Sequence, residues 1–186
     1  MTAETAKPRR RLPGDLTPEQ LIDRVIRVDQ AGEYGARRIF EGQLAVLPPG
    51  PDRAAVEHMA AQERRHLAAF DQMLSDRRAR PTALQPLWHV AGFALGAATA
   101  LLGAKAAMAC TVAVENAINE HYESQRDALG QDEAPLRETV EKFRQEELEH
   151  RDIALAEGAE QAPGYRVLSG LIGAGCRAAI RLSEII

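Results

Sequence analysis

Aromatic residues and cysteines are scarce in this sequence of 186 residues, and the net charge is small. Aromatic side chains account for 4% of the chain, and the formal net charge is −4 at pH 7. A charge this small gives no indication of nucleic-acid binding. The two cysteines, Cys110 and Cys176, form no Cys-x-x-Cys motif. We therefore expect reduced, buried packing residues in a cytosol-facing protein.

Strand patterns are also lacking. No run of alternating β-branched residues stands out, whereas Ala, Leu, Glu and Arg are abundant, so the sequence predicts an all-α fold. The length fits one domain, which we expect to span residues 16–186. The polar N-terminus gives no indication of a secretory signal. Residues 1–15 are predicted to be a disordered basic tail, which either attracts anionic lipid or only aids solubility.

Two Glu-x-x-His motifs are the main chemical feature of the sequence. They are Glu63 to His66 and Glu147 to His150. Positions i and i+3 of an α-helix lie on one face, so both side chains of each motif can reach the same point. One such motif is weak evidence, because glutamate is common. Two of them point to paired ligand sets on two helices.

A further glutamate precedes each motif at nearly the same interval. Glu33 lies 30 residues before Glu63, and Glu115 lies 32 residues before Glu147. An interval of about 30 residues corresponds to one long helix and a turn. The two halves together supply four carboxylates and two imidazoles. This is the ligand set of a di-iron or di-manganese site inside a four-helix bundle.

Helix signals support four bundle helices. Thr17 is a good N-cap, Pro18 suits the first helical position, and Gln20 completes a capping box. Pro48 and the residues after it end this helix. Gly130 suits the position after the third helix. The ranges we expect to be helical are Thr17–Leu47, Asp52–Arg77, Ala104–Leu129 and Pro135–Glu157.

Each expected bundle helix has an apolar stripe that a carboxylate interrupts near mid-length. Glu33, for example, shares its helix face with Ile26 and Phe40. The carboxylates in the other stripes are Glu63, Glu115 and Glu147. Glu146 and Glu149 are expected to face solvent. An unpaired carboxylate inside a protein is strongly unfavourable, so the pattern favours cation ligands over a row of solvated charges.

A long uncharged segment separates the two halves. No Asp, Glu, Lys or Arg occurs from Pro81 to Ala104, yet the segment is rich in Ala and Gly and is marginal for a membrane span. We expect a helix at a membrane surface, with a buried crossover helix or a transmembrane helix as alternatives. His89 lies in this segment and is not expected to be a ligand. A final amphipathic helix after Pro163 would cap the bundle, join an oligomer or lie on a bilayer.

The ligand types narrow the metal but not the reaction. Carboxylates and imidazoles without thiolate favour iron or manganese over structural zinc. Iron storage, a tyrosyl radical cofactor, peroxide dismutation and hydroxylation all remain open at this level, because neither the fold nor the site fixes the reaction.

A resemblance to a known family favours one of these reactions. The run Arg27–Ala36 resembles the first-helix signature of the di-iron demethoxyubiquinol hydroxylases of ubiquinone biosynthesis. The similarity covers the chain from about residue 20 to its end. The other segments that carry it are Ile39–Gln43, Glu63–His66, Val114–Tyr122 and Glu146–Asp152.

The resemblance implies both a fold and a reaction. The implied fold is a ferritin-like four-helix bundle with a long crossover helix between its second and third helices and an added C-terminal amphipathic helix. The implied protein lies peripherally on the cytoplasmic face of the cell membrane. It hydroxylates the ring of a polyprenylated 6-methoxy-3-methyl benzoquinol with dioxygen and an external electron donor, NADH being one candidate. Other ubiquinone-synthesis proteins or a second copy of the chain are candidate partners.

The resemblance also assigns residues. The ligands it implies for two iron ions are Glu33, Glu63, His66, Glu115, Glu147 and His150, with Glu63 and Glu147 as bridges. The side chains expected to orient the imidazoles are Asp29, His121 and Asp152. Tyr122 is expected on the substrate or electron path; from its helix position alone, it either lines the cavity or places its hydroxyl on a core partner. The alternatives to a hydroxylase are an iron-binding or ferroxidase bundle and a non-catalytic helical bundle.

Overall fold

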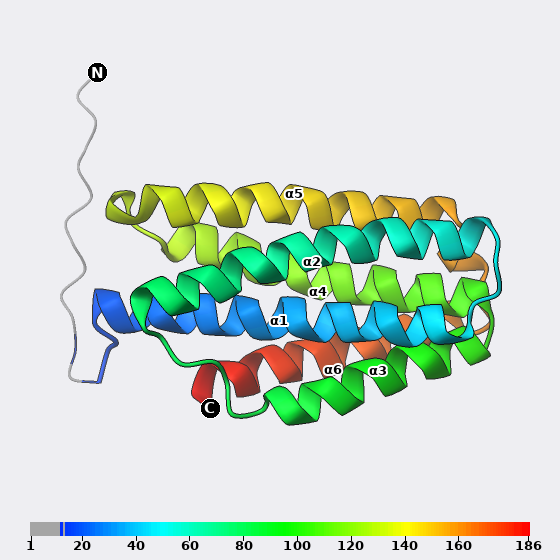
Figure 1. The fold of residues 1–186 in the computed structure, drawn as a ribbon, viewed down its shortest axis with the longest axis horizontal. Coiled ribbons are helices and arrows are strands. Elements are labelled where there is room, and N and C mark those ends of the chain that lie inside the picture. The colour runs from blue at the N-terminus through cyan, green and yellow to red at the C-terminus, as the bar shows by residue number, and fades with distance from the viewer. Residues whose placement is uncertain (1–11, 13) are drawn as a thin grey trace, which may run out of the picture.

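Six α-helices make up most of the described chain, which comprises residue 12 and residues 14–186 and contains no strand in this computed structural model (Figure 1). The helices are α1 (Pro18–Val46), α2 (Pro51–Arg77), α3 (Gln85–Leu101), α4 (Ala104–Ala128), α5 (Ala134–Ala156) and α6 (Tyr165–Ile185). The all-α prediction is confirmed. Most of the predicted basic tail, residues 1–11 and 13, lies outside the described residues, so the division at residue 15 stays a prediction.

Four of the helices form an elongated bundle. In Figure 1, α1, α2, α4 and α5 run along the long axis, with α1 packed against α2 and α4 packed against α5. The crossover helix α3 lies along α1, and α6 lies along α4 and α1, so both cover the same side of the bundle. The predicted ferritin-like bundle, with its crossover helix and its C-terminal helix, is confirmed.

The predicted start of α1 is formed as the sequence indicated. The Thr17 hydroxyl accepts a hydrogen bond from the backbone N–H of Gln20 at 3.2 Å, and the Gln20 side chain accepts one from the Thr17 N–H at 2.9 Å. These bonds satisfy two donors that a helix start otherwise leaves unpaired. At the end of α4, Gly130 follows the cap, but its φ of −75° is not left-handed.

The apolar core divides into two main clusters along the bundle axis. One contains Phe40, Met59 and Met108, and the other contains Ile26 and Phe70. On both α1 and α2, the ligand glutamate lies in the chain between residues of the two clusters. Packing of apolar residues on both sides therefore fixes the position along the bundle axis at which the carboxylates face one another.

Glycines allow α3 to approach α1 closely. A Cβ atom added at Gly96 would lie 1.9 Å from the backbone oxygen of Ile39, and one added at Gly42 would lie 2.2 Å from that of Phe93. No larger residue fits at either position without moving a helix. The crossover helix is therefore attached to the bundle by direct backbone contact.

The outer sides of α3 and α6 remain apolar and exposed. Val90 on α3 is 65% exposed, and Leu171 on α6 is 70% exposed. The Trp88 indole N–H donates a 3.1 Å hydrogen bond to the Ser183 hydroxyl, which links the two helices. Within the described residues, no helix combines the length and apolar character that crossing a membrane requires.

Both cysteines are free thiols, as predicted. Cys110 is buried, and burial raises the pKa of its thiol to about 12. Cys176 is only half-buried, since it lies on the partly exposed helix α6. Both pack in a small apolar cluster to which α1, α3, α4 and α6 contribute, consistent with a packing role.

Candidate metal centre

Six polar side chains from four helices meet between the two core clusters. The structure brings together all the ligands that the sequence predicted, each buried: Glu33 of α1, Glu63 and His66 of α2, Glu115 of α4, and Glu147 and His150 of α5. Their donor atoms form two overlapping groups, each with all atoms within 4.8 Å of one another. A charged or ionisable group stays in such an interior only where a partner compensates it.

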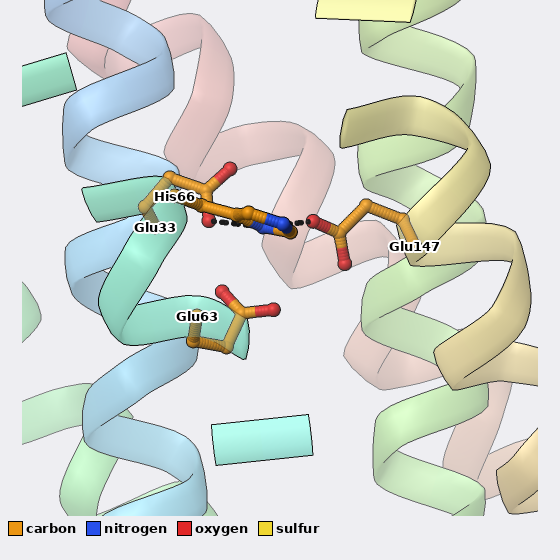
Figure 2. Close-up of side chains that lie close together, drawn as sticks. All are labelled: Glu33, Glu63, His66 and Glu147. Carbon is orange, nitrogen blue, oxygen red and sulfur yellow. Dashed lines mark ion pairs between the residues drawn. The ribbon is translucent and has the colours of Figure 1, made fainter. Parts of the chain in front are cut away.

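One group is arranged around His66. Figure 2 shows the imidazole between two carboxylates, with its Nδ1 atom 3.4 Å from Glu33 Oε2 and 3.0 Å from Glu147 Oε1. The carboxylate of Glu63 completes this group and points into the same space. Three helices therefore supply the four donors of the His66 group.

The second group is arranged around His150. Its Nδ1 atom lies 3.0 Å from Glu147 Oε2 and 3.2 Å from Glu63 Oε1. Glu115 is more distant, with its Oε1 atom 3.9 Å away. Glu63 and Glu147 belong to both groups, whereas each histidine belongs to one. This sharing is what two bridged metal ions require, and the predicted bridges are the two shared residues.

Unsatisfied buried atoms test whether a metal fits. Both oxygens of Glu63 and of Glu115 make no hydrogen bond, and neither does one oxygen each of Glu33 and Glu147. The Nδ1 atom of His66 also lacks hydrogen-bonding geometry. Buried polar atoms are nearly always paired in folded proteins. Seven unpaired atoms within these two adjoining groups fit a pair of cations bound by oxygen and nitrogen donors.

Without a cation, the carboxylates oppose one another. Burial raises the pKa of Glu63 well above its usual value, and the charges of Glu147 and Glu33 raise it further. Burial and Glu147 likewise raise the pKa of Glu115. Protons therefore compete with metal for these oxygens, because a metal ligand must be deprotonated.

The histidines partly compensate this repulsion. Burial alone would lower the pKa of His66, but the close carboxylates of Glu147 and Glu33 raise it to about 10. Burial would raise the pKa of Glu147, yet the imidazoles of His150 and His66 lower it to about 2. In the metal-free protein, a positive His66 thus takes part of the role that a cation would have.

The Tyr122 hydroxyl lies on a core partner that is itself a predicted ligand. The phenol is buried and donates a hydrogen bond to Glu33 Oε1. The other oxygen of Glu33 remains directed at His66. Burial and the negative charge of Glu33 raise the pKa of Tyr122, so the phenol keeps its proton. Tyr122 therefore holds Glu33 in place; a role on the substrate or electron path stays a prediction.

The prediction that Asp29, His121 and Asp152 orient the imidazoles is wrong. Asp29 accepts a hydrogen bond from Gln125 at 2.6 Å and lies 3.5 Å from His121, so these side chains contact one another instead of the ligands. Asp152 is paired with Arg151, its neighbour in the sequence, on the exposed side of α5. The resemblance suggested these residues, but it does not fix which side chains they contact in the folded protein.

Two other residues contact the outer nitrogens of the imidazoles. His66 Nε2 lies 2.7 Å from Glu146 Oε2, and His150 Nε2 lies 3.0 Å from Gln62 Oε1. The prediction that Glu146 faces solvent is wrong, because its side chain is only 20% exposed. Each residue directly precedes the glutamate of a Glu-x-x-His motif. That position was the available signal.

Sequence comparison identifies the family to which this arrangement belongs. The family described as ubiquinone biosynthesis protein COQ7 matches residues 20–183. The chain belongs to this family. The prediction of a demethoxyubiquinol hydroxylase family, made from the first-helix signature and the ligand motifs, is confirmed.

Relatives of this COQ7-family chain carry hydroxylase names. It is 64% identical over 175 residues to the 3-demethoxyubiquinol 3-hydroxylase of Rhodospirillum rubrum, covering 94% of this chain and 82% of that protein. It is 53% identical over 167 residues to the human NADPH-dependent 3-demethoxyubiquinone 3-hydroxylase, mitochondrial, covering 88% and 77%. The mitochondrial 5-demethoxyubiquinone hydroxylase of Saccharomyces cerevisiae is 40% identical over 182 residues, covering 89% and 78%.

Proposed function

We propose that this COQ7-family chain hydroxylates the ring of a polyprenylated 6-methoxy-3-methyl benzoquinol, a demethoxyubiquinol, with dioxygen at a di-iron centre. This is a late step of ubiquinone biosynthesis. The ligands we assign to the two iron ions are Glu33, Glu63, His66, Glu115, Glu147 and His150. The observation that carries the proposal is the set of seven unpaired, buried donor atoms in a chain whose relatives are named as hydroxylases of this quinone.

The donor set supports iron as the metal. Each group offers three carboxylates and one imidazole, and neither cysteine takes part. Such oxygen-rich sites suit iron or manganese, whereas thiolates would select zinc or iron–sulfur clusters. Glu63 and Glu147 are the proposed bridges because they belong to both groups. Two iron ions held by these residues would supply the redox chemistry that dioxygen activation needs, relaying electrons from an external donor.

The chain's own residues keep the centre dry and ordered. The Phe143 ring stacks on the His66 imidazole at a centroid distance of 4.1 Å, and Phe40 meets the His150 ring edge-on at 6.3 Å. Apolar walls exclude water, which strengthens electrostatic interactions inside the site and prevents side reactions with water. The Tyr122 hydroxyl holds one oxygen of Glu33 and leaves the other for the metal.

The reaction needs a donor that the chain does not contain. One atom of dioxygen enters the ring carbon and the other leaves as water, so two electrons and two protons are required from outside. A reduced nicotinamide nucleotide, NADH or NADPH, is the proposed source, because the human relative is named NADPH-dependent.

The substrate's prenyl tail accounts for the apolar exterior of α3 and α6. A polyprenyl chain stays in lipid, so the protein has to meet its substrate at a membrane. We assign the exposed apolar side chains of these two helices to peripheral contact with the cytoplasmic face of the cell membrane. They are Leu87, Val90, Leu101, Val167, Leu171, Leu182 and Ile185, together with the C-cap residues Leu102 and Ile186.

The decisive experiment follows oxygen from the gas into the product. The iron-loaded full chain is supplied with demethoxyubiquinol in detergent or vesicles, a chemical reductant and ¹⁸O₂. We expect one ¹⁸O atom per molecule of hydroxylated quinol by mass spectrometry. Product that lacks the label, or no product from a protein containing two irons, would reject the proposal. Iron oxidation without product, in a large hollow assembly, would support the ferroxidase alternative.

A pair of variants tests the residue assignment. Glu115→Gln removes one proposed ligand and is expected to lose iron and turnover while the helices remain. Glu120→Gln, on the same helix, is the matched control, because Glu120 is exposed and lies 3.6 Å from Arg177 on α6. Equal iron content and turnover in the two variants would contradict the assignment of Glu115.

A further inference from the structure

The outer hydrogen bonds of the two imidazoles are reciprocal but chemically unequal. The residue before Glu147 on α5 reaches His66 on α2, and the residue before Glu63 on α2 reaches His150 on α5. The first is Glu146 and the second is Gln62. The residue before each motif therefore hydrogen-bonds to the histidine of the other motif, through a carboxylate in one case and a neutral amide in the other.

In both cases the imidazole is the donor. The inner Nδ1 atoms of His66 and His150 face the ligand carboxylates, where a metal would need their lone pairs. A neutral imidazole that keeps its lone pair on Nδ1 carries its proton on Nε2. The Nε2–H groups then donate to Glu146 Oε2 at 2.7 Å and to Gln62 Oε1 at 3.0 Å.

The two acceptors differ in strength. Hydrogen bonds to an ionised carboxylate are shorter and about twice as strong as those between neutral groups. A carboxylate acceptor also makes a metal-bound imidazole a stronger donor. Gln62 fixes the orientation of His150 without adding charge. The imidazole of His66 is therefore the more electron-rich of the two.

Neighbouring charges do not cancel this difference. Arg65 and Lys142 each approach Glu146 to 3.9 Å, but both cations are largely exposed, so solvent screens them. Tyr122 lies on the same side of the centre and donates a hydrogen bond to Glu33, which weakens Glu33 as a ligand. Because the phenol is neutral and contacts only one oxygen of Glu33, the other oxygen still faces the centre.

We propose that Glu146 and Gln62 are positioning residues that make the two metal positions unequal, with the ion beside His66 bound more tightly and harder to reduce. This inference rests on the proposed function, because it requires both iron positions. The order follows from chemistry: the His66 position has a carboxylate-supported imidazole, and the His150 position has an amide-supported one. The ion beside His150 is the first to be lost and the first to be reduced.

Exchanging the two acceptors tests the inference. The full chain is titrated anaerobically with ⁵⁷Fe(II), and the two steps are followed by Mössbauer spectroscopy. For Glu146→Gln we expect the tighter step to weaken by about 10- to 100-fold and one quadrupole doublet to shift. For Gln62→Glu we expect the weaker step to tighten and the other doublet to shift. Glu149→Gln removes the same charge from an exposed site on the same helix and should change neither.

Several results would overturn the inference. Glu146→Gln with both affinities and both doublets unchanged would do so, as would equal weakening of both steps. Circular dichroism checks that each variant stays helical; if Glu146→Gln unfolds, an unchanged weaker step in Gln62→Glu contradicts the inference. If the wild-type chain takes up two irons and neither variant changes their binding, only this inference is rejected. A wild-type chain that takes up none rejects the proposed function itself.

Discussion

The hydroxyl of Tyr122 on α4 donates a hydrogen bond to Glu33 on α1, and both side chains are buried. The bond joins helices that face each other across the bundle, and it fixes a carboxylate whose second oxygen lies 3.4 Å from His66. Burial and the charge of Glu33 both favour the protonated phenol. The hydroxyl thus orients a proposed metal ligand before any metal binds.

Tyr122→Phe is expected to destabilise the metal-free protein by about 1–3 kcal/mol, because it leaves a buried carboxylate oxygen without its donor. Urea unfolding in the presence of a chelator measures the loss. Tyr34→Phe is the control, since the Tyr34 hydroxyl bonds to His89 at 2.6 Å near the surface, where water can replace the partner. Equal losses in the two variants would contradict this account of Tyr122.

The metal-free protein should become less stable as the pH rises above neutrality. The pKa of His66 is raised from 6.5 to about 10 in the folded state, so its stabilisation is complete below pH 6.5 and lost as the pH approaches 10. The raised pKa values of Glu63 and Glu115 act in the same direction above 4.5. Free energies of unfolding, extrapolated from urea titrations at pH 6 and pH 9, should differ by more than about 1 kcal/mol.

Iron should reverse this dependence on pH, because metal binding releases protons and strengthens as the pH rises.

At low pH, Glu147 limits the stability of the metal-free protein. Its pKa is lowered from 4.5 to about 2, so the stability that it contributes is present above pH 4.5 and is lost as the pH falls toward 2. The metal-free protein is therefore expected to be most stable in mildly acidic solution. A metal-free form that gains stability between pH 6 and pH 9 would refute the electrostatic account of the centre.

Gly96→Ala should destabilise the protein by about 1–3 kcal/mol, since the added methyl group has no space against α1. Its Cβ atom would lie 1.9 Å from the Ile39 backbone oxygen. Gly170→Ala on α6 is the control: nothing lies within 4 Å of its added Cβ, and helical propensity should stabilise it by about 0.5–1 kcal/mol. Thermal unfolding that shows the same sign for both variants would argue against close α1–α3 packing.

Val90→Glu combined with Leu171→Glu should abolish co-sedimentation with lipid vesicles, because charge at either position opposes contact with the bilayer. Both side chains are exposed, so the fold should tolerate the change. Ala54→Glu with Gln131→Glu adds the same charge at exposed positions outside α3 and α6. Vesicle binding that falls equally in both double variants would show general repulsion and no specific apolar surface.

The ligand set was predictable because it depends on local geometry. Glu63 and His66 share a face of one helix whatever surrounds it, and the interval from Glu33 matches one helix and a turn. The start of α1 was predictable for the same reason, since its capping box lies within four residues. Local rules of this kind need no knowledge of how the helices pack.

The support of the ligands was not predictable in this way. Whether Glu146 meets solvent or His66 depends on the rotation of α5 against α2, and no helical wheel of one segment contains that angle. Asp152 shows the converse error: it follows His150 by two residues but points out of the bundle. The crossover helix was also ambiguous, because its composition fits both lipid and protein. Gly42 and Gly96 determine its place only when α1 lies opposite.

Anomalous X-ray diffraction at the iron edge, on crystals of the iron-loaded full chain, tests the central claim most directly. The account predicts two iron peaks between Glu63 and Glu147, one beside Nδ1 of His66 and the other beside Nδ1 of His150. A single peak, or iron bound only at other residues, would contradict it.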